Sequence, residues 1–231
     1  MGVQDKYKTL ADLPSELPIF PLGGALLLPR APLPLNIFEP RYLKMVDDAM
    51  RSHRLIGMVQ PDTTAGIKAQ GEAHARPSVY GTGCAGRITT FSETDDNRFL
   101  ITLTGVSRFR VAGEIDTDEP YRVCTADFAP FADDLKPGLG EEAVDREALL
   151  EAFRKFLEAN SMEADWEEVG ETPTELLVNT LCILSPYDAA EKQAMLEADT
   201  LKSRAETLIT LTEMVLAGSG SGQRLGASRL Q

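Results

Sequence analysis

Glu39 and Arg41 are charged residues that could have a chemical role, because they lie between an apolar run and a predicted packed helix. They belong to the tetrapeptide Glu39-Pro40-Arg41-Tyr42, which follows a proline-rich apolar stretch. A carboxylate and a guanidinium in such a place usually pair, because an unpaired charge near a core is costly. We therefore interpret Glu39 and Arg41 as a structural clasp that ties a loop to a helix, and we assign them no catalytic role.

Gly81, Gly83 and Gly86 match the dinucleotide-binding pattern G-x-G-x-x-G. That pattern binds a pyrophosphate only where a helix begins at its end, whereas residues 87–91 are typical of a strand. We interpret these glycines as sites of a bulge or of close strand packing. The sequence also lacks a G-x-x-x-x-G-K-[ST] loop, which excludes a P-loop nucleotide hydrolase. We predict no cofactor.

The remaining candidates for metal ligation or nucleophilic catalysis are weak. His53 and His74 have no second ligand at metal-binding spacing, so we predict no metal site. The cysteines form no C-x-x-C pair and fall within patterns typical of buried thiols. The pair Lys202-Ser203 lies inside a predicted amphipathic helix. We predict no catalytic residue, and an enzyme of unrecognised type stays open as an alternative.

The charge of the chain limits the classes of partner. Its 231 residues include 36 acidic and 23 basic ones, which gives a formal net charge of −13. Nucleic-acid binding needs a concentrated basic face, and we find no such cluster, so we predict no nucleic-acid partner. Three widely spaced cysteines and a polar N-terminal stretch without a signal-peptide pattern favour a cytoplasmic location.

The apolar stretch from Leu22 to Leu35 raises the question of a membrane span. A transmembrane helix needs about 20 consecutive residues compatible with a helix. This stretch is interrupted by Pro29, Pro32 and Pro34, which break a helix. We therefore predict no membrane partner and expect short extended pieces with turns between them.

Short strand-like segments dominate the first half of the chain. They are rich in β-branched and aromatic residues and span residues 54–60, 83–91, 98–104, 107–111 and 121–128. One predicted helix interrupts them, because apolar residues recur with helical spacing from Tyr42 to Met50 after Pro40. Such closely spaced strands indicate a barrel or a sandwich. Segment 62–77 shows neither the alternation of a strand nor the spacing of a helix, and its role stays open.

A helical part follows the strands. Residues 132–145 are acidic and contain Gly and Pro, which indicates a boundary between subdomains. Beyond them apolar residues recur with helical spacing, and helices are predicted to begin near Pro173 and Pro186. We predict a β-barrel subdomain over residues 15–131, a helical subdomain over 141–217 and a flexible tail over 218–231. The predicted fold class is α+β.

Several short motifs occur in a fixed order in the first half of the chain. They are Leu17-Pro18-Ile19-Phe20-Pro21-Leu22, Leu33-Pro34-Leu35, Ile37-Phe38-Glu39-Pro40-Arg41-Tyr42, Gly81-Thr82 with Ala85, and Gly105 with Arg108-Phe109-Arg110. Their order and spacing resemble the N-terminal, substrate-binding domain of the Lon proteases. The resemblance covers roughly residues 15–215 and implies an N-terminal PUA-like β barrel with one packed helix, followed by a helical subdomain. It also implies a stand-alone bacterial member that lacks the ATPase and peptidase domains.

The resemblance implies a non-catalytic module that binds unfolded or tagged polypeptides and acts as an adaptor or regulator of proteolysis, with a Lon protease as a candidate partner. PUA-like barrels often bind RNA, so an RNA-binding module is an alternative, which the net charge disfavours. For polypeptide binding we predict an exposed apolar patch beside the barrel. Leu26, Leu27 and Leu28 are the predicted peptide-binding residues, because they lie in a proline-bounded loop. Ordinary core packing of these leucines is the competing interpretation.

Overall fold

A computed structural model describes residues 6–62 and 77–219 of the chain. The chain divides into two compact units, and each is made of two separate segments. Unit 1 contains the described parts of Met1–Leu139 together with Asn179–Glu197, and unit 2 contains Gly140–Val178 with the described part of Ala198–Gln231. Residues 63–76 of the unassigned loop and 220–231 of the predicted tail lie outside the described residues.

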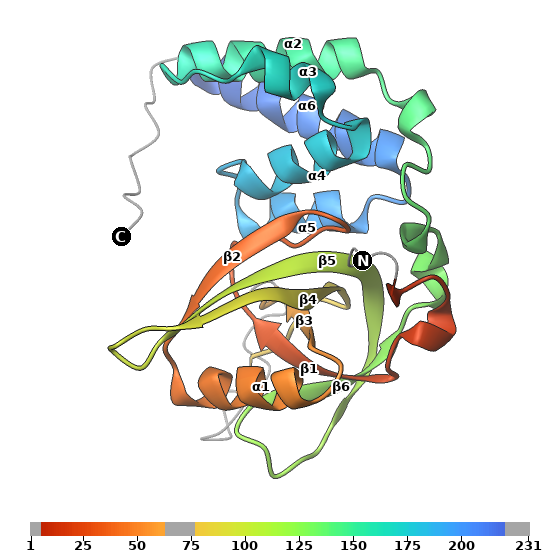
Figure 1. The fold of residues 1–231 in the computed structure, drawn as a ribbon. Helices are drawn as coiled ribbons and strands as arrows, with labels where there is room; N and C mark the ends of the chain where they lie inside the picture. Colours follow the sequence, from red (N-terminus) through yellow and green to blue (C-terminus); the bar gives the residue numbers. More distant parts are fainter. Residues whose placement is uncertain (1–5, 63–76, 220–231) are drawn as a thin grey trace. The chain divides into compact units, whose positions relative to one another are not determined.

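Unit 1 is built on a six-stranded sheet, drawn from red to green in Figure 1. The strands are β1 (Glu16–Pro21), β2 (Pro32–Ile37), β3 (Leu55–Val59), β4 (Thr82–Glu93), β5 (Phe99–Ile115) and β6 (Arg122–Asp127). Their order is β2-β5-β4-β3-β1-β6, and further pairing between β5 and β6 closes the sheet into a barrel. Strands β1 and β3 are parallel, and the other paired neighbours are antiparallel.

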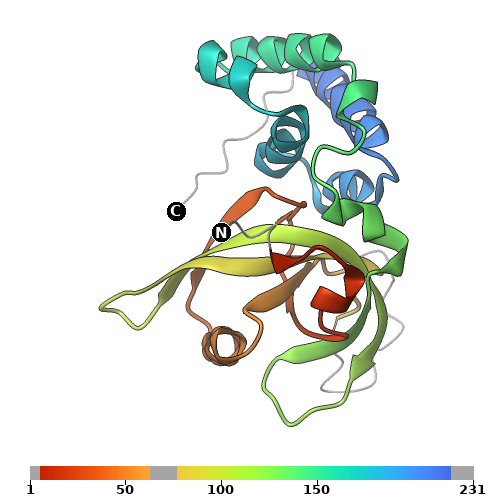
Figure 2. The same cartoon turned by 45° about the vertical axis from the view of Figure 1, so that its right-hand side comes forward.

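The 17-residue strand β5 closes the barrel because it pairs with β2 near its start and with β6 near its end. Figure 2 shows its ribbon bending strongly around the barrel. The prediction of two separate strands over 98–104 and 107–111 was wrong, because Gly105 lies within one continuous strand. A Cβ at Gly105 would lie 2.6 Å from the carbonyl carbon of Leu28. This glycine therefore permits a close backbone crossing and does not end the strand.

Helix α1 (Pro40–Arg51) confirms the predicted apolar stripe. Tyr42, Met45, Val46 and Ala49 are buried, and Pro40 occupies the first turn. Proline is tolerated there because the first N–H groups of a helix have no intrahelical partner. Figure 2 shows α1 almost end-on beside the strands, so its stripe covers one side of unit 1.

Two glycines of the G-x-G-x-x-G pattern, Gly83 and Gly86, serve close strand packing as predicted, whereas an added Cβ at Gly81 would meet nothing within 4 Å. Gly83 and Gly86 lie inside β4, and no helix follows them. A Cβ at Gly83 would lie 2.6 Å from the backbone oxygen of Met58 and 2.9 Å from the ring of Phe109. Only a residue without a side chain fits between these atoms, so the pattern does not indicate a nucleotide site.

Helix α5 (Ala189–Glu197) belongs to unit 1, although the predicted helical subdomain included it. Gln193 Nε2 donates to the backbone oxygen of Thr82 at 3.2 Å, and Gln60 Nε2 donates to that of Ala189 at 2.9 Å. These buried hydrogen bonds bind α5 to the barrel strands. The expected continuous helical subdomain is therefore corrected to a segment that is interrupted by residues 179–197.

Helix α5 also begins later than predicted. The sequence Ser185-Pro186 suggested a start near residue 186, but the helix begins at Ala189. Asp188 accepts from the backbone N–H of Glu191 at 2.9 Å, and Glu191 accepts from that of Asp188 at 2.8 Å. This reciprocal capping box defines the start, while Ser185 Oγ instead donates to Leu181 O.

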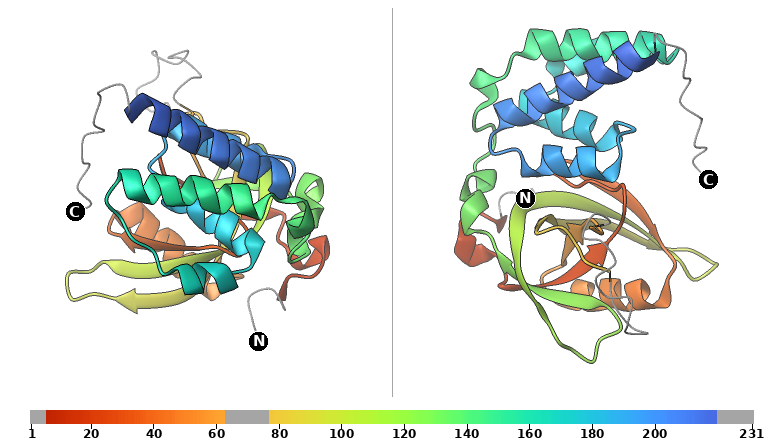
Figure 3. Two further views of the ribbon diagram at one scale, coloured as in Figure 1. Left: turned by 90° about the horizontal axis from the view of Figure 1, so that it is seen from above. Right: turned by 180° about the vertical axis from the view of Figure 1, so that it is seen from behind.

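Unit 2 is helical in its described residues. Its elements are η4 (Glu141–Ala143), α2 (Arg146–Ala159), α3 (Trp166–Glu171), the first part of α4 (Thr174–Leu184) and α6 (Leu201–Ser219). Helices α2 and α6 pack along each other, as Figure 3 shows. Because α6 includes Gly218 and Ser219, the predicted tail begins after these two residues at the earliest. Short 3₁₀ turns in unit 1 are η2 (Leu10–Asp12) and η3 (Ala129–Leu135).

Candidate functional site

The three leucines predicted to bind peptides are buried. Leu26, Leu27 and Leu28 expose 2%, 1% and 0% of their surface, so the expected exposure was wrong. The backbone beside them is held against β5, because Arg30 N donates to Gly105 O at 2.8 Å and Gly105 N donates to Ala31 O at 3.1 Å. The three leucines therefore point into the core, and the competing interpretation of ordinary core packing agrees with their burial.

Glu39 and Arg41 form the predicted ion pair at the start of α1. Arg41 Nε and Nη2 both donate to Glu39 Oε2, at 2.9 and 2.7 Å. Their side chains are 44% and 53% exposed, and the pair joins two residues of one turn. An exposed pair of this kind contributes about 0–1 kcal/mol, so the clasp is local and modest. The Arg41 guanidinium also lies 4.6 Å from the centre of the Tyr42 ring.

The exposed face of β2, β5 and β4 carries an open groove of about 460 Å³, which we call the β2–β5–β4 groove. Asn36 lies opposite Leu100, and Leu100 lies opposite Ser92. Pro34 lies opposite Thr102 on the same strands. Since alternate residues of a strand share one face, these side chains form one continuous surface.

Two large apolar side chains on this face are open to solvent. Leu100 is 47% exposed and lines the groove, and Phe38, two residues beyond Asn36, is 61% exposed. The guanidinium of Arg98 lies 5.8 Å from the centre of the Phe38 ring. Single exposed apolar residues are common on protein surfaces, but neighbouring ones beside a groove are typical of an interaction site. Leu100 and Phe38 are therefore candidates for the predicted apolar patch beside the barrel, in place of the three predicted leucines.

Strand β2 limits how a ligand could bind to this face. In the described sheet β2 pairs on one side only, with β5, so its other edge is unpaired. Pro32 and Pro34 have no N–H, and proline in a sheet usually turns its nitrogen to the free edge. Two backbone donors are therefore missing from the edge that an added strand would use. The geometry favours binding through side chains on the face over strand addition.

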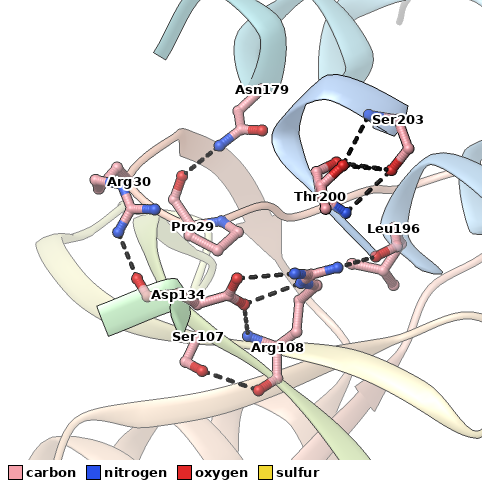
Figure 4. A network of polar contacts seen from close by, with 9 residues as sticks. All are labelled: Pro29, Arg30, Ser107, Arg108, Asp134, Asn179, Leu196, Thr200 and Ser203. Atoms are coloured by element: carbon pink, nitrogen blue, oxygen red, sulfur yellow. Dashed lines mark hydrogen bonds and ion pairs between the residues drawn. The ribbon is translucent and has the colours of Figure 1, made fainter. Parts of the chain in front are cut away.

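Unit 1 also contains a buried ion pair, shown in Figure 4. Arg108 and Asp134 are 5% and 8% exposed, and Arg108 Nε and Nη2 donate to the two Asp134 oxygens at 2.9 Å each. The backbone N–H of Arg108 also donates to Asp134 at 2.8 Å, and Arg108 Nη1 donates to Leu196 O at 3.1 Å. Arg30 Nη1 donates to the backbone oxygen of Asp134 at 2.6 Å. This network joins β5, η3 and the end of α5, which indicates a structural role.

The nucleophile candidates are held in structural roles. Thr200 and Ser203 bond each other at the start of α6, where Ser203 N donates to Thr200 Oγ1 at 3.0 Å (Figure 4). Lys202 is more than half exposed and pairs with Glu206 at 3.8 Å. His53 is exposed, and His74 lies outside the described residues. Among the residues that the structure describes, no group of three His, Cys, Asp or Glu side chains is placed to hold a metal ion.

We expect the three cysteines to be unreactive in the native protein. Cys84, Cys124 and Cys182 are all buried as thiols and form no disulfide, and burial raises the pKa of the Cys124 thiol to about 12. The reactive thiolate of Cys124 is therefore scarce near neutral pH, and burial makes all three thiols inaccessible. Titration with a disulfide reagent should detect no rapid reaction in buffer and three thiols after denaturation. Rapid reaction of a native thiol would contradict this prediction.

The fold class is shown by two solved structures. A Lon N-terminal domain protein from Xanthomonas campestris matches with a TM-score of 0.53 and 25% identity, covering 85% of this chain and 98% of that chain. The N-terminal domain of the Mycobacterium avium complex Lon protease matches with a TM-score of 0.62 at 15% identity, covering 86% and 98%. The protein therefore has the α+β fold of Lon N-terminal domains, as predicted. Its described residues contain no helix that is long and apolar enough to span a membrane.

The sequence comparison places the chain in a family. Residues 16–213 match the ATP-dependent protease La (LON) substrate-binding domain, so the chain belongs to that family. The Lon protease of Dictyoglomus thermophilum is 26% identical over 207 residues, which cover 84% of this chain and 24% of that protein. Lon protease 2 of Myxococcus xanthus is 26% identical over 209 residues, which cover 87% and 24%. The chain thus spans about a quarter of the length of these relatives.

Proposed function

We propose that this chain binds unfolded or tagged polypeptides without cleaving them, and that it acts as an adaptor or regulator of proteolysis. The observation that carries the proposal is the β2–β5–β4 groove, which is lined by the exposed Leu100, together with the exposed Phe38 that follows β2, on a substrate-binding-domain fold. Apolar segments of an unfolded chain would cover these side chains and leave water. A Lon protease is the proposed partner, since related domains occur within proteins of that name.

The surface chemistry supports a polypeptide as the ligand. The groove is open along the sheet, so an extended chain can lie across it. Leu100 in the groove and Phe38 outside its lining offer apolar contacts, and Thr90 and Thr102 line the groove with hydroxyl groups. Contacts with few directional constraints tolerate many sequences, as recognition of unfolded proteins requires.

Replacing Leu100 or Phe38 by aspartate should weaken binding of fluorescein-labelled β-casein about tenfold at each position, measured by fluorescence polarisation. The expected size follows from the loss of one partly buried apolar contact and the burial of a charge in its place. Both residues are exposed, so neither substitution should unfold the protein.

Leu139→Asp is the matched control, because Leu139 is 49% exposed, against 47% for Leu100, and lies in unit 1 outside the groove. Its affinity for casein should equal that of the wild type. Equal weakening by Leu139→Asp would reject the groove as the site, and no casein binding by the wild type would reject the function. Casein fragments formed in the presence of ATP and Mg²⁺ would reject the non-catalytic part of the proposal.

The adaptor role has its own readout. The rate at which a purified Lon protease degrades casein should change when this protein is added, and it should change less with Leu100→Asp. An unchanged rate, despite binding of casein to this protein, would reject the regulatory role and leave polypeptide binding in place.

A further inference from the structure

Unit 1 has a second concave site, at the start of α1, which we call the Arg–Tyr pocket. It has a volume of about 170 Å³ and is lined by Arg41, Arg122, Tyr42, Tyr121 and four prolines. A cavity of about 150 Å³ is large enough to hold a benzene ring. The pocket can therefore hold one aromatic or large aliphatic side chain between rigid apolar walls.

Tyr42 brings an unused polar group to this pocket. Only 7% of its surface is exposed, and its ring packs on Phe20 with the ring centres 4.2 Å apart. Within the described part of the chain its hydroxyl has no hydrogen-bond partner, whereas Tyr121 Oη donates to Asp48 at 2.8 Å. The Tyr42 hydroxyl is therefore available to donate a hydrogen bond to a ligand in the pocket.

The charges of the pocket favour a ligand that accepts hydrogen bonds. In a protein with a net charge of −13, the lining contains two arginines and no acidic residue. Arg122 is committed to Glu114 and to the backbone oxygen of Pro77. Arg41 is half exposed, and both of its bonds to Glu39 come from Nε and Nη2 and reach one oxygen atom. Its Nη1 has no partner among the described residues and can donate to a ligand.

We propose that the Arg–Tyr pocket binds the C-terminal residue of a polypeptide that ends in an apolar side chain. The side chain lies between the prolines and tyrosines, and the terminal carboxylate accepts from Arg41 Nη1 and the Tyr42 hydroxyl. A guanidinium and a hydroxyl together form strong, charge-assisted bonds to a carboxylate. This inference rests on the proposed function, because it names the part of a polypeptide that a second site recognises.

The test uses a fluorescein-labelled Gly/Ser peptide that ends in phenylalanine, as a free acid and as an amide, with binding measured by fluorescence polarisation. The acid should bind about tenfold more tightly than the amide. Arg41→Gln should remove about tenfold of the affinity for the acid, and Tyr42→Phe about fivefold, since it keeps the ring and removes one hydrogen bond. Arg51→Gln is the control, because Arg51 lies on the same helix, is 74% exposed and does not line the pocket.

Each outcome decides one point. The proposal would be overturned if the acid and the amide bound equally, or if the acid did not bind at all. It would also be overturned if Arg51→Gln lost as much affinity as Arg41→Gln. If N-acetylphenylalanine competes as well as the peptide acid, the pocket takes a free aromatic acid and the polypeptide assignment is overturned. The Leu100→Asp variant should bind the peptide acid normally. Casein binding that depends on Leu100 but not on Arg41 would leave the groove in place and remove only this inference.

Discussion

Replacing Arg108 by methionine while Asp134 is retained should lower the free energy of unfolding by about 3–5 kcal/mol. The reason is that Asp134, which is 8% exposed, would keep a negative charge away from water after losing its guanidinium partner. The carbonyl oxygen of Leu196 would lose a hydrogen bond as well. Urea denaturation followed by circular dichroism should show a lower midpoint, by about 1–2 M.

Two comparisons separate this effect from loss of packing. Arg108→Met combined with Asp134→Asn should recover part of the lost stability, because it removes both charges and keeps a side-chain oxygen that can accept from the backbone N–H of residue 108. Lys136→Met should leave the midpoint unchanged, since the Lys136–Asp133 pair is exposed on both sides. A midpoint for Arg108→Met equal to that of the wild type would show that the buried pair does not stabilise the fold.

Gly105→Ala is expected to destabilise the protein by about 3 kcal/mol or more, although it adds one methyl group. The new Cβ would meet the backbone of Leu28, at 2.6 Å from its carbonyl carbon. That backbone cannot move without weakening the bonds that join Arg30 and Ala31 to Gly105. The melting temperature should fall by about 6 °C or more, measured by differential scanning calorimetry.

Gly113→Ala provides the matched control in the same strand. A Cβ at Gly113 would meet nothing within 4 Å, and no positive φ is recorded there. The substitution should be neutral or should stabilise by about 0.4–1 kcal/mol, because it restricts the unfolded chain. If both variants had the melting temperature of the wild type, the close contact between residues 28–31 and β5 would be contradicted.

The sequence predicts those parts of the fold that depend on local patterns. The stripe from Tyr42 to Ala49 specifies α1 because helical spacing is visible within one segment. Gly105 led to a wrong prediction of a break between two strands. A glycine is needed at this position because the backbone of residues 28–29 passes close to it, and this contact is not visible in the local sequence. The start of α5 was placed too early because a Ser-Pro pair was weighted over Asp188 and Glu191, whose spacing was equally visible.

The candidate site was harder to predict than the fold, because exposure is a tertiary property. Leu26, Leu27 and Leu28 are apolar in a proline-bounded loop, and this pattern is typical of a core segment as well as of a binding loop. Leu100 did carry a signal. In the run Phe99-Leu100-Ile101 both faces of the strand are apolar, and alternation with the buried Ile101 places Leu100 outside. A strand with two apolar faces indicates that the outer face also contacts something.

The division of each unit into two chain segments affects how the protein is made. The barrel strands are complete once residue 127 has been synthesised, but the segment that binds Gln60 and Thr82 follows only at residues 189–193. During synthesis, the nascent barrel therefore leaves these groups uncovered while about sixty further residues are added, on the order of 3–12 s at typical elongation rates. A ribosome stalled within unit 2 would hold a barrel without its last helix, in a form that chaperones and proteases can bind.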